Sequence, residues 1–418
     1  MLPTDDYDVF VGVDWGNARH QVCVLDPARQ VLGERTVEHS GPGLAALADW
    51  LGALAPGAPA RIAVALEMPR GAIVDSLLAR GLHVFSINPK PLDRFRDRHS
   101  VAGAKDDRRD AFVAADALRT DRWAFRRLAP DHPLILQLRE GTRLDQEMQQ
   151  ALTRLANRLR DQLLRFYPAL LHLVPAADEP WLWALLALAP TPAAGAHVPR
   201  ARLARLLQTH RIRRLSAEAV RDALRAPALP VTPGTVEAAA SHVALLVPRL
   251  QLVHAQRAQG ARHIDTLLAA YLAEAPAAGP PRAHHDVAIL RSLPGVGRLV
   301  AATLLAEAAP LLAARAYPAL RAQAGIAPVT RQSGKHRGVL MRYGCNHRLQ
   351  QAVYHWARVS AQCDAHSRAH YTALRQRGHS HPRAVRGVAD RLLALLIAML
   401  KNDTLYDAAR PRRRELAA

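Results

Sequence analysis

Cysteine is scarce in this 418-residue chain, and the scarcity excludes two kinds of protein. Cys23, Cys345 and Cys363 are too few for a disulfide framework and favour a reducing compartment. Cys345 and His347 could form half of a zinc site, but no second pair stands at zinc-finger spacing. We therefore predict neither a disulfide-rich secreted fold nor a structural zinc module.

Long apolar runs are also missing. No Lys-rich segment followed by an apolar run opens the sequence, as a secretion signal would. The closest approach to a membrane span, at 385–400, is broken by Arg386, Asp390 and Arg391. We expect a soluble, cytoplasmic protein without a membrane partner.

Acidic residues are outnumbered, with 36 Asp and Glu against 56 Lys and Arg, which gives a formal net charge of +20. This excess predicts attraction to a polyanion. Hydrophobic residues make up 50% of the chain, enough for two or three domains with their own cores. The pattern is that of a globular nucleic-acid-binding protein without a recognisable finger or homeodomain.

The first 130 residues predict an α/β domain. Alternating β-branched residues indicate strands, and amphipathic or Ala-rich runs indicate helices. In chain order we expect strands at 7–14, 21–25 and 30–38, a helix at 43–54, a strand at 61–66, a helix at 69–80, a strand at 82–87, and a helix through 112–118. This order is that of the ribonuclease H-like fold, whose active site lies where the first and fourth strands end beside the final helix.

That topology would bring four carboxylates together. Asp14 ends the first strand and Glu67 follows the fourth, while Asp107 and Asp110 share a helix face because they are three residues apart. Mg²⁺ prefers such oxygen ligands, and two ions about 4 Å apart can bind the attacking and leaving oxygens of a phosphoryl displacement. Since four acids without a cation would repel one another, the sequence predicts a divalent metal site.

Three alternatives compete with this interpretation. The acidic helix could be a solvated surface helix, and Asp106 could share a face with Asp110 almost as well as Asp107 does. The stretch Gly12-Val13-Asp14-Trp15-Gly16 also looks like the first phosphate loop of sugar kinases and actin-like ATPases. Those proteins need a second Asp-x-Gly loop and a Gly-rich adenosine loop, and neither is present.

Residues 131–275 predict a helical arm after a Pro-bearing linker at 127–133. Two long amphipathic helices, from Leu134 and over 235–272, would pack antiparallel, with 175–235 as a cap or insertion and with bends at Pro248 and Gly260. The arm could equally carry a dimer contact. The predicted apolar stripe of the first helix is Leu144, Met148, Leu152, Leu155, Leu159 and Leu163.

Residues 285–408 follow a linker at 275–281 and predict a mainly helical domain. The turn Leu293-Pro294-Gly295-Val296-Gly297 between two helical runs is typical of a helix-hairpin-helix. In that motif Gly295 and Gly297 would leave backbone N–H groups open to a phosphate. The alternative is a packing turn between core helices.

Ser333 is predicted to lie on a loop because Gly334 makes a helix unlikely there. A serine in such a position often bonds its own backbone in a turn. The surrounding basic residues could instead hold a phosphodiester against the hydroxyl, which could then attack phosphorus. Those candidate nucleic-acid-binding residues are Arg331, Lys335, Arg342 and Arg348.

Taken together, these motifs resemble the DEDD transposases of the insertion-sequence 110 class, described as bridge-RNA-guided recombinases. The resemblance runs nearly end to end. It rests on Val11-Gly12-Val13-Asp14, Ala65-Leu66-Glu67, Ile87-Asn88-Pro89, Lys105-Asp106-Asp107-Arg108-Arg109-Asp110-Ala111, Leu293-Pro294-Gly295-Val296-Gly297, Ala324-Gly325-Ile326-Ala327-Pro328 and Arg331-Gln332-Ser333-Gly334-Lys335. One departure is Trp15-Gly16-Asn17, where many members have a small residue and a lysine.

The resemblance implies a RuvC-like N-terminal domain at 1–130, a coiled-coil arm at 131–275 and a C-terminal transposase domain at 285–408. It assigns the metal ligands to Asp14, Glu67, Asp107 and Asp110, against Asp106, and the nucleophile to Ser333. It further implies dimers or tetramers in which the serine loop of one subunit completes the carboxylate site of another. A structured noncoding RNA would pair with donor and target DNA.

We therefore expect an enzyme that cuts and rejoins DNA by Mg²⁺-dependent phosphoryl transfer, with sequence read by guide-RNA pairing. A hydrolytic RuvC-like nuclease or resolvase would use the same acids with water as nucleophile, and Ser333 would then be incidental. A catalytically silent nucleic-acid-binding protein would need neither the acids nor the serine.

Overall fold

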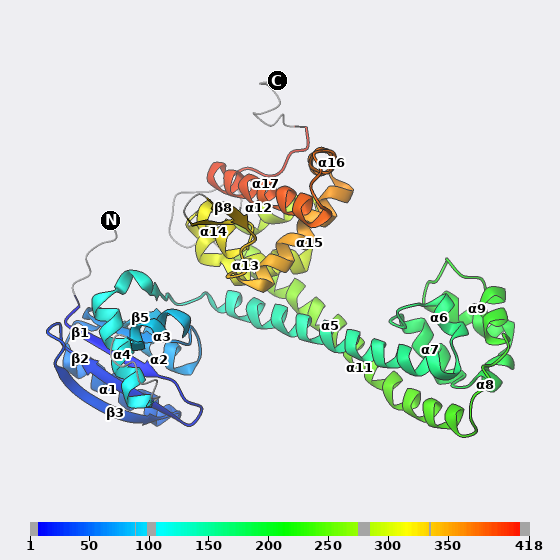
Figure 1. Ribbon diagram of the computed structural model, residues 1–418, viewed down its shortest axis with the longest axis horizontal. Helices are drawn as coiled ribbons and strands as arrows, with labels where there is room; N and C mark the ends of the chain where they lie inside the picture. The colour runs from blue at the N-terminus through cyan, green and yellow to red at the C-terminus, as the bar shows by residue number, and fades with distance from the viewer. Residues whose placement is uncertain (1–6, 88, 98–105, 275–284, 334–335, 410–418) are drawn as a thin grey trace. The chain divides into compact units, whose positions relative to one another are not determined.

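The computed structural model describes residues 7–87, 89–97, 106–274, 285–333 and 336–409 (Figure 1). The chain divides into two compact units, Met1–His132 and Pro133–Ala418. The division into three functional domains stays a prediction.

The first unit is a mixed α/β domain built on one six-stranded sheet. Its strands are β1 (Val9–Asp14), β2 (Arg19–Leu25), β3 (Val31–Glu38), β4 (Ile62–Leu66), β5 (His83–Ser86) and β6 (Arg126–Arg127). They lie in the order β3-β2-β1-β4-β5-β6. β1, β2 and β3 pair antiparallel, while β4 pairs parallel to both β1 and β5. β6 pairs antiparallel to β5 and was not predicted.

Four helices accompany this sheet: α1 (Gly41–Leu54), α2 (Ala72–Ala79), α3 (Pro89–Asp97) and α4 (Asp107–Thr120). Alternation along the strands divides the apolar side chains between two faces. Val9, Val11 and Val13 pack in one core with residues of α1 and α2. Phe10 lies on the other face, in a core that contains the buried side of α4. The sheet therefore lies between helical layers, and α3 is the helix that the sequence did not predict.

Gly12 allows α4 to pack directly on β1. A Cβ atom at Gly12 would lie 1.9 Å from the backbone oxygen of Ala111 and 2.5 Å from the backbone nitrogen of Ala115. Backbone atoms of a packed helix cannot yield to such a contact without moving the helix. The glycine thus fixes how closely the first turns of α4 approach the end of β1.

We expect Gly12→Ala to lower the stability of the first unit by about 3 kcal/mol, because overpacking against backbone displaces α4. Amide hydrogen exchange of β1 would measure this loss locally. Gly52→Ala is the matched control, since a Cβ atom at Gly52 of α1 would meet nothing within 4 Å and alanine favours a helix. Equal protection of β1 in the two variants would contradict the close packing.

The second unit begins with two long helices, α5 (Pro133–Phe166) and α11 (Thr235–Ala273). The start of α5 shares a core with the end of α11, and the end of α5 shares another core with the start of α11, so the two run antiparallel (Figure 1). Half of the predicted stripe is buried, at Leu152, Leu159 and Leu163, and Leu155 packs partly buried against the same core. α11 continues as one helix through Pro248.

Two expectations about the arm were wrong. Leu144 is 49% exposed, because the inward position there belongs to Asp145, whose carboxylate accepts hydrogen bonds from Arg257 Nε at 2.9 Å and Nη2 at 3.3 Å. We also expected no segment of membrane-spanning length. By length and composition alone, however, α11 is long and apolar enough to cross a membrane, with a mean hydropathy of 1.2 in its most apolar window. Of that window, 28% is buried within the structure.

Five short helices cap the arm: α6 (Ala169–Leu173), α7 (Pro180–Leu188), α8 (Pro192–Ala196), α9 (Arg200–Thr209) and α10 (Ala217–Leu224). Four of them, α7 to α10, lie within 175–235, the segment that the sequence predicted as a cap or insertion. Trp181 and Trp183 are fully buried in the core of this cap. The cap therefore packs onto the end of α5 and the start of α11 and shares one core with them.

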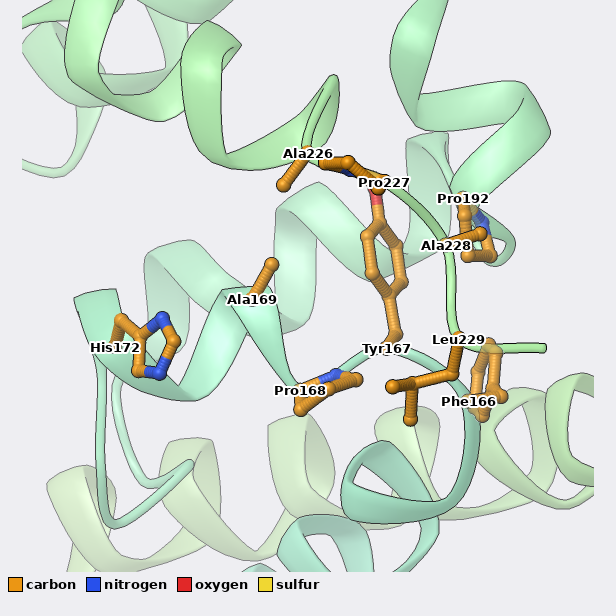
Figure 2. A pocket seen from close by; sticks show the side chains of 10 residues that line it. All are labelled: Phe166, Tyr167, Pro168, Ala169, His172, Pro192, Ala226, Pro227, Ala228 and Leu229. Atoms are coloured by element: carbon orange, nitrogen blue, oxygen red, sulfur yellow. The ribbon is translucent and has the colours of Figure 1, made fainter. Parts of the chain in front are cut away.

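A small pocket of about 180 Å³ opens in the cap (Figure 2). Aromatic, proline and small apolar side chains form its wall, and no acidic residue does. The lining residues are Phe166, Tyr167, Pro168, Ala169, His172, Pro192, Ala226, Pro227, Ala228 and Leu229. None of the candidate site residues lies there.

The chain returns from the arm into α12 (Asp286–Ser292), α13 (Arg298–Ala313) and α14 (Tyr317–Gln323), then a two-stranded hairpin of β7 (Val329–Ser333) and β8 (His336–Leu340). α15 (His347–Cys363), α16 (Ala365–Gln376) and α17 (His381–Asn402) complete the unit. Trp356 and the apolar face of α17 share one core with the base of the arm. The predicted mainly helical character of this region is confirmed.

Candidate active site

The four predicted acids follow elements that the first unit brings side by side. Asp14 is the last residue of β1, and Glu67 comes directly after β4. Because Val13 pairs with Leu66 in the parallel β1–β4 register, Asp14 and Glu67 follow paired residues at one edge of the sheet. Asp107 and Asp110 lie in the first turn of α4, which packs across β1 at Gly12.

The electrostatics of Asp14 show that the acids are close enough to affect one another. The pKa of the Asp14 carboxyl is raised to about 6, first by burial and then by the negative charges of Asp107, Asp110 and Glu67. Arg96 acts in the opposite direction. The charges of the other three acids therefore act on Asp14, and the site that the four would form stays a prediction.

Arg96, which the sequence did not point to, lies beside this group. From α3 its Nε donates to Oδ1 of Asp110 at 2.7 Å, and its Nη1 donates to Oδ1 of Asp93 at 2.7 Å. The side chains of Arg96 and Asp110 are 15% and 13% exposed, so the ion pair is largely withdrawn from water. No motif signals this contact, because the two residues belong to different helices.

Asp106 serves as the N-cap of α4, unlike Asp107, which lies within the helix. Its side chain caps α4 by accepting a hydrogen bond from the backbone nitrogen of Arg108 at 3.3 Å, a role that short acidic side chains favour. Arg108 itself forms an ion pair with Glu34 of β3. The capping bond occupies Asp106 at the helix start, while Asp107 and Asp110 belong to the first turn.

The donor chemistry of the four acids fits a hard divalent cation, and the raised pKa of Asp14 marks an excess of negative charge that such a cation would offset. Within the described residues, however, no three His, Cys, Asp or Glu side chains are already arranged as a metal-binding group. Asp110 is instead paired with Arg96. The assignment of Asp14, Glu67, Asp107 and Asp110 as metal ligands therefore stays a prediction.

Ser333 was expected on a loop, and that expectation was wrong. It is the last residue of β7 and pairs with His336 of β8 across a connection of only two residues. Gly334 and Lys335, together with the Ser333 side chain, lie outside the described residues.

The candidate basic residues near Ser333 have separate surroundings. Arg331 is exposed on β7 and pairs with Gly338. Arg342 Nε donates to the backbone oxygen of Ala327 at 3.2 Å and so braces the base of the hairpin. Arg348 lies in the first turn of α15, and its Nε is buried without a hydrogen-bond partner in the described structure. Their contact with a phosphate stays a prediction.

A buried carboxylate anchors the segment that follows the hairpin. Glu307 of α13 accepts a hydrogen bond from Asn346 Nδ2 at 2.7 Å, and its other oxygen accepts one from Arg143 Nε of α5 at 3.3 Å. Asn346 in turn caps α15 through its side-chain oxygen. This chain of bonds fixes the β8–α15 connection against the arm.

The two candidate glycines of the α12–α13 turn differ. Gly295 has a φ of 76°, and a Cβ there would lie 2.6 Å from Ser360 Oγ. The preceding carbonyl of Pro294 accepts bonds from Trp356 Nε1 at 2.9 Å and Ser360 Oγ at 2.7 Å. Gly295 is thus needed for packing. Gly297 caps α13, and a Cβ there would meet nothing within 4 Å, which leaves space for a ligand.

Comparison with known proteins covers both units. A DEDD transposase model of the IS110 type matches residues 11–168, and a model described as transposase IS116/IS110/IS902 family matches residues 287–372. A putative transposase, y4uE, of Sinorhizobium fredii is 45% identical over 215 residues, 51% of this chain and 60% of that protein.

Two proteins of Streptomyces coelicolor are similar along their whole length. The mini-circle putative transposase for IS117 is 32% identical over 417 residues, with 97% of each chain covered. An uncharacterized 43.6 kDa protein of insertion element IS110 is 30% identical over 433 aligned positions, with 100% of each covered. The chain therefore belongs to the IS110/IS116/IS902 family of transposases.

Proposed function

We propose that this transposase cuts and rejoins DNA strands by phosphoryl transfer through a phosphoserine at Ser333, at a metal site formed by Asp14, Glu67, Asp107 and Asp110. The observation that carries the proposal is the placement of these acids, since Asp14 and Glu67 follow paired residues of β1 and β4, and α4 begins with Asp107 and packs across β1. After burial, the negative charges of the other three acids raise the pKa of Asp14. The sheet order, with three antiparallel strands followed by parallel β4 and β5, is consistent with a RuvC-like, ribonuclease H-like domain.

When bound, a divalent cation such as Mg²⁺ would stabilise negative charge that develops on the phosphate. The Ser333 hydroxyl attacks phosphorus, the serine oxygen–phosphorus bond forms as the bond to the departing strand breaks, and the serine proton ends on the departing hydroxyl. A hydroxyl of the partner strand then attacks the phosphoserine and restores Ser333. The bond energy is conserved in the phosphoserine, so rejoining needs no other energy source.

The acids belong to the first unit and Ser333 to the second. The proposed reaction therefore requires these units to meet, either within one chain or between subunits of a homodimer or tetramer. We place the reaction in the cytoplasm, with donor DNA, target DNA and a structured noncoding guide RNA as partners. The net charge of +20 supports binding to such polyanions.

Excision of a marked element in cells tests the proposal against its alternatives. Glu67→Ala combined with Asp107→Ala should abolish excision, whereas a catalytically silent binding protein would tolerate both changes. The purified double variant should still bind nucleic acid. Both replaced residues are exposed and acidic, so their negative charges do not contribute to the attraction of DNA. Continued excision by the double variant would remove the metal site from the proposal.

We also predict that the α12–α13 turn contacts DNA. In a helix-hairpin-helix, the N–H groups at the start of α13 contact a DNA phosphate. Gly297→Asp should keep the helix cap, since aspartate is a favoured N-cap residue, but it should reduce DNA affinity by about tenfold near 0.1 M salt. A filter-binding or anisotropy titration measures this. Gly52→Asp carries the same added charge on α1, so an equal loss in that control would argue against contact at Gly297.

A further inference from the structure

The carboxylate cluster contains a cation of its own. Arg96 donates from Nε to Asp110 at 2.7 Å, and both side chains are largely withdrawn from water. Its second bond, from Nη1 to Asp93, also measures 2.7 Å, but Asp93 is 61% exposed. Arg96 therefore has one partner inside the cluster and one at the surface of its own helix.

The positive charge of Arg96 also affects Asp14. Burial and then three neighbouring acids raise the pKa of Asp14, whereas the charge of Arg96 lowers it. Burial disfavours the charge of Arg96 itself, but hydrogen bonds to Asp110 and Asp93 and the charges of these acids raise its pKa overall. Because a guanidinium does not lose its proton in proteins, this charge can leave the cluster only by movement of the side chain.

We infer that Arg96 is a counter-ion that a divalent cation must displace from Asp110, and that it thereby limits how much metal the free protein binds. The inference rests on the proposed metal site. Two sources of positive charge compete for one carboxylate, and a guanidinium within a few ångströms of a divalent ion repels it. After displacement from Asp110, the guanidinium of Arg96 would keep its ion pair with Asp93.

The arrangement couples metal binding to the nucleic acid. Before a substrate arrives, Arg96 neutralises part of the cluster, so the free protein is stable without metal and binds it weakly. A phosphate at the cluster adds negative charge, which attracts both the metal and the released guanidinium. The complete set of metal, Arg96 and phosphate therefore forms together, and the metal-dependent cut is delayed until DNA is in place.

The test is Mn²⁺ binding by the full-length protein without DNA, measured from the electron paramagnetic resonance signal of free Mn²⁺. We expect Arg96→Gln to bind Mn²⁺ about tenfold more tightly than the wild type, since one repelling charge is removed. Arg96→Met, which keeps the apolar stem, should do the same. Arg96→Lys should stay within about twofold of the wild type because it retains the charge.

Arg119→Gln is the matched control. Arg119 donates to Asp116 at 2.7 Å and is 21% exposed, so its ion pair resembles that of Arg96, but it lies in the last turn of α4. Its loss should leave Mn²⁺ affinity unchanged. Amide exchange of β1 verifies that each variant is folded. Two neutral substitutions at position 96 are used so that the test still stands if one of these two variants fails to fold.

The outcomes separate the two proposals. Mn²⁺ binding that Asp14→Asn abolishes, and that both neutral variants of Arg96 strengthen, supports the counter-ion. Binding that Asp14→Asn abolishes but that neither neutral variant strengthens overturns the role of Arg96 and leaves the metal site intact. Binding that is unaffected by Asp14→Asn overturns the metal site, and with it the inference.

Discussion

Ser333→Ala is expected to abolish strand transfer, with a loss on the order of 10⁴-fold or more, because removal of a nucleophile eliminates the covalent route. The assay supplies the full-length protein with guide RNA, donor and target DNA and Mg²⁺, and it counts joined products. Trapping on denaturing gels measures the protein–DNA adduct directly. The wild type should form a phosphoserine adduct and Ser333→Ala should form none, while both bind DNA equally.

Ser360→Ala is a useful comparison, since Ser360 is a buried serine of the same unit whose hydroxyl donates to Pro294. It should lower stability without removing the adduct. Mixing Ser333→Ala with Asp14→Asn then tests where the units meet. Recovery of activity in the mixture indicates that the serine of one subunit works with the acids of another. Full strand transfer by Ser333→Ala would instead favour water as nucleophile and a hydrolytic nuclease.

The sequence predicted where the four acids lie in the secondary structure, because their positions follow from local rules. Alternating valines placed the end of β1 at Asp14, a short apolar run placed the end of β4 before Glu67, and helical spacing put Asp107 and Asp110 on one face. A parallel β1–β4 pair then brings these ends together without further information. Such features depend on neighbours in the chain or on a common topology.

Arg96 could not be predicted in this way. Its partner Asp110 lies on another helix, and basic residues are so frequent in this chain that no single one stands out. The same applies to Leu144, which was predicted to be buried but is exposed. Asp145 occupies the buried position instead, because Arg257 of α11 forms an ion pair with it. A buried polar residue is invisible to hydrophobic periodicity because its partner comes from a distant segment.

The hairpin at Ser333 shows a third limit. Glycine excluded a helix, and the remaining choice between loop and strand depended on pairing between β7 and β8, which short polar segments signal weakly. Its base is fixed by tertiary contacts, including the bond of Arg342 to Ala327 and the cap at Asn346. These contacts fix the base of the hairpin, and the bond of Arg342 to Ala327 has no sequence motif.

Asp14→Asn is expected to separate function from stability. The folded-state pKa of Asp14 is about 6, above the ordinary 3.8, so the stability that its neutral form provides is complete below about pH 4 and is lost as the pH rises through 6. Asparagine stays neutral and avoids this loss. Without metal, the variant should therefore exceed the wild type by about 1–2 kcal/mol at pH 8, after allowance for partial exposure, and should match it near pH 4.

The same substitution should reduce strand transfer by roughly 10³-fold or more, because it removes a charged metal ligand. Amide exchange of β1 at pH 4.5 and pH 8 measures the stability difference, and addition of Mg²⁺ should stabilise the wild type but not Asp14→Asn. Asp49→Asn is the control, since Asp49 pairs with Arg80 at the surface, where the loss of one exposed partner has little effect. An Asp14→Asn protein that is no more stable than the wild type at pH 8 would mean that the four carboxylates do not strain one another. The electrostatic case for a divalent cation would then be lost, whatever the activity of the variant.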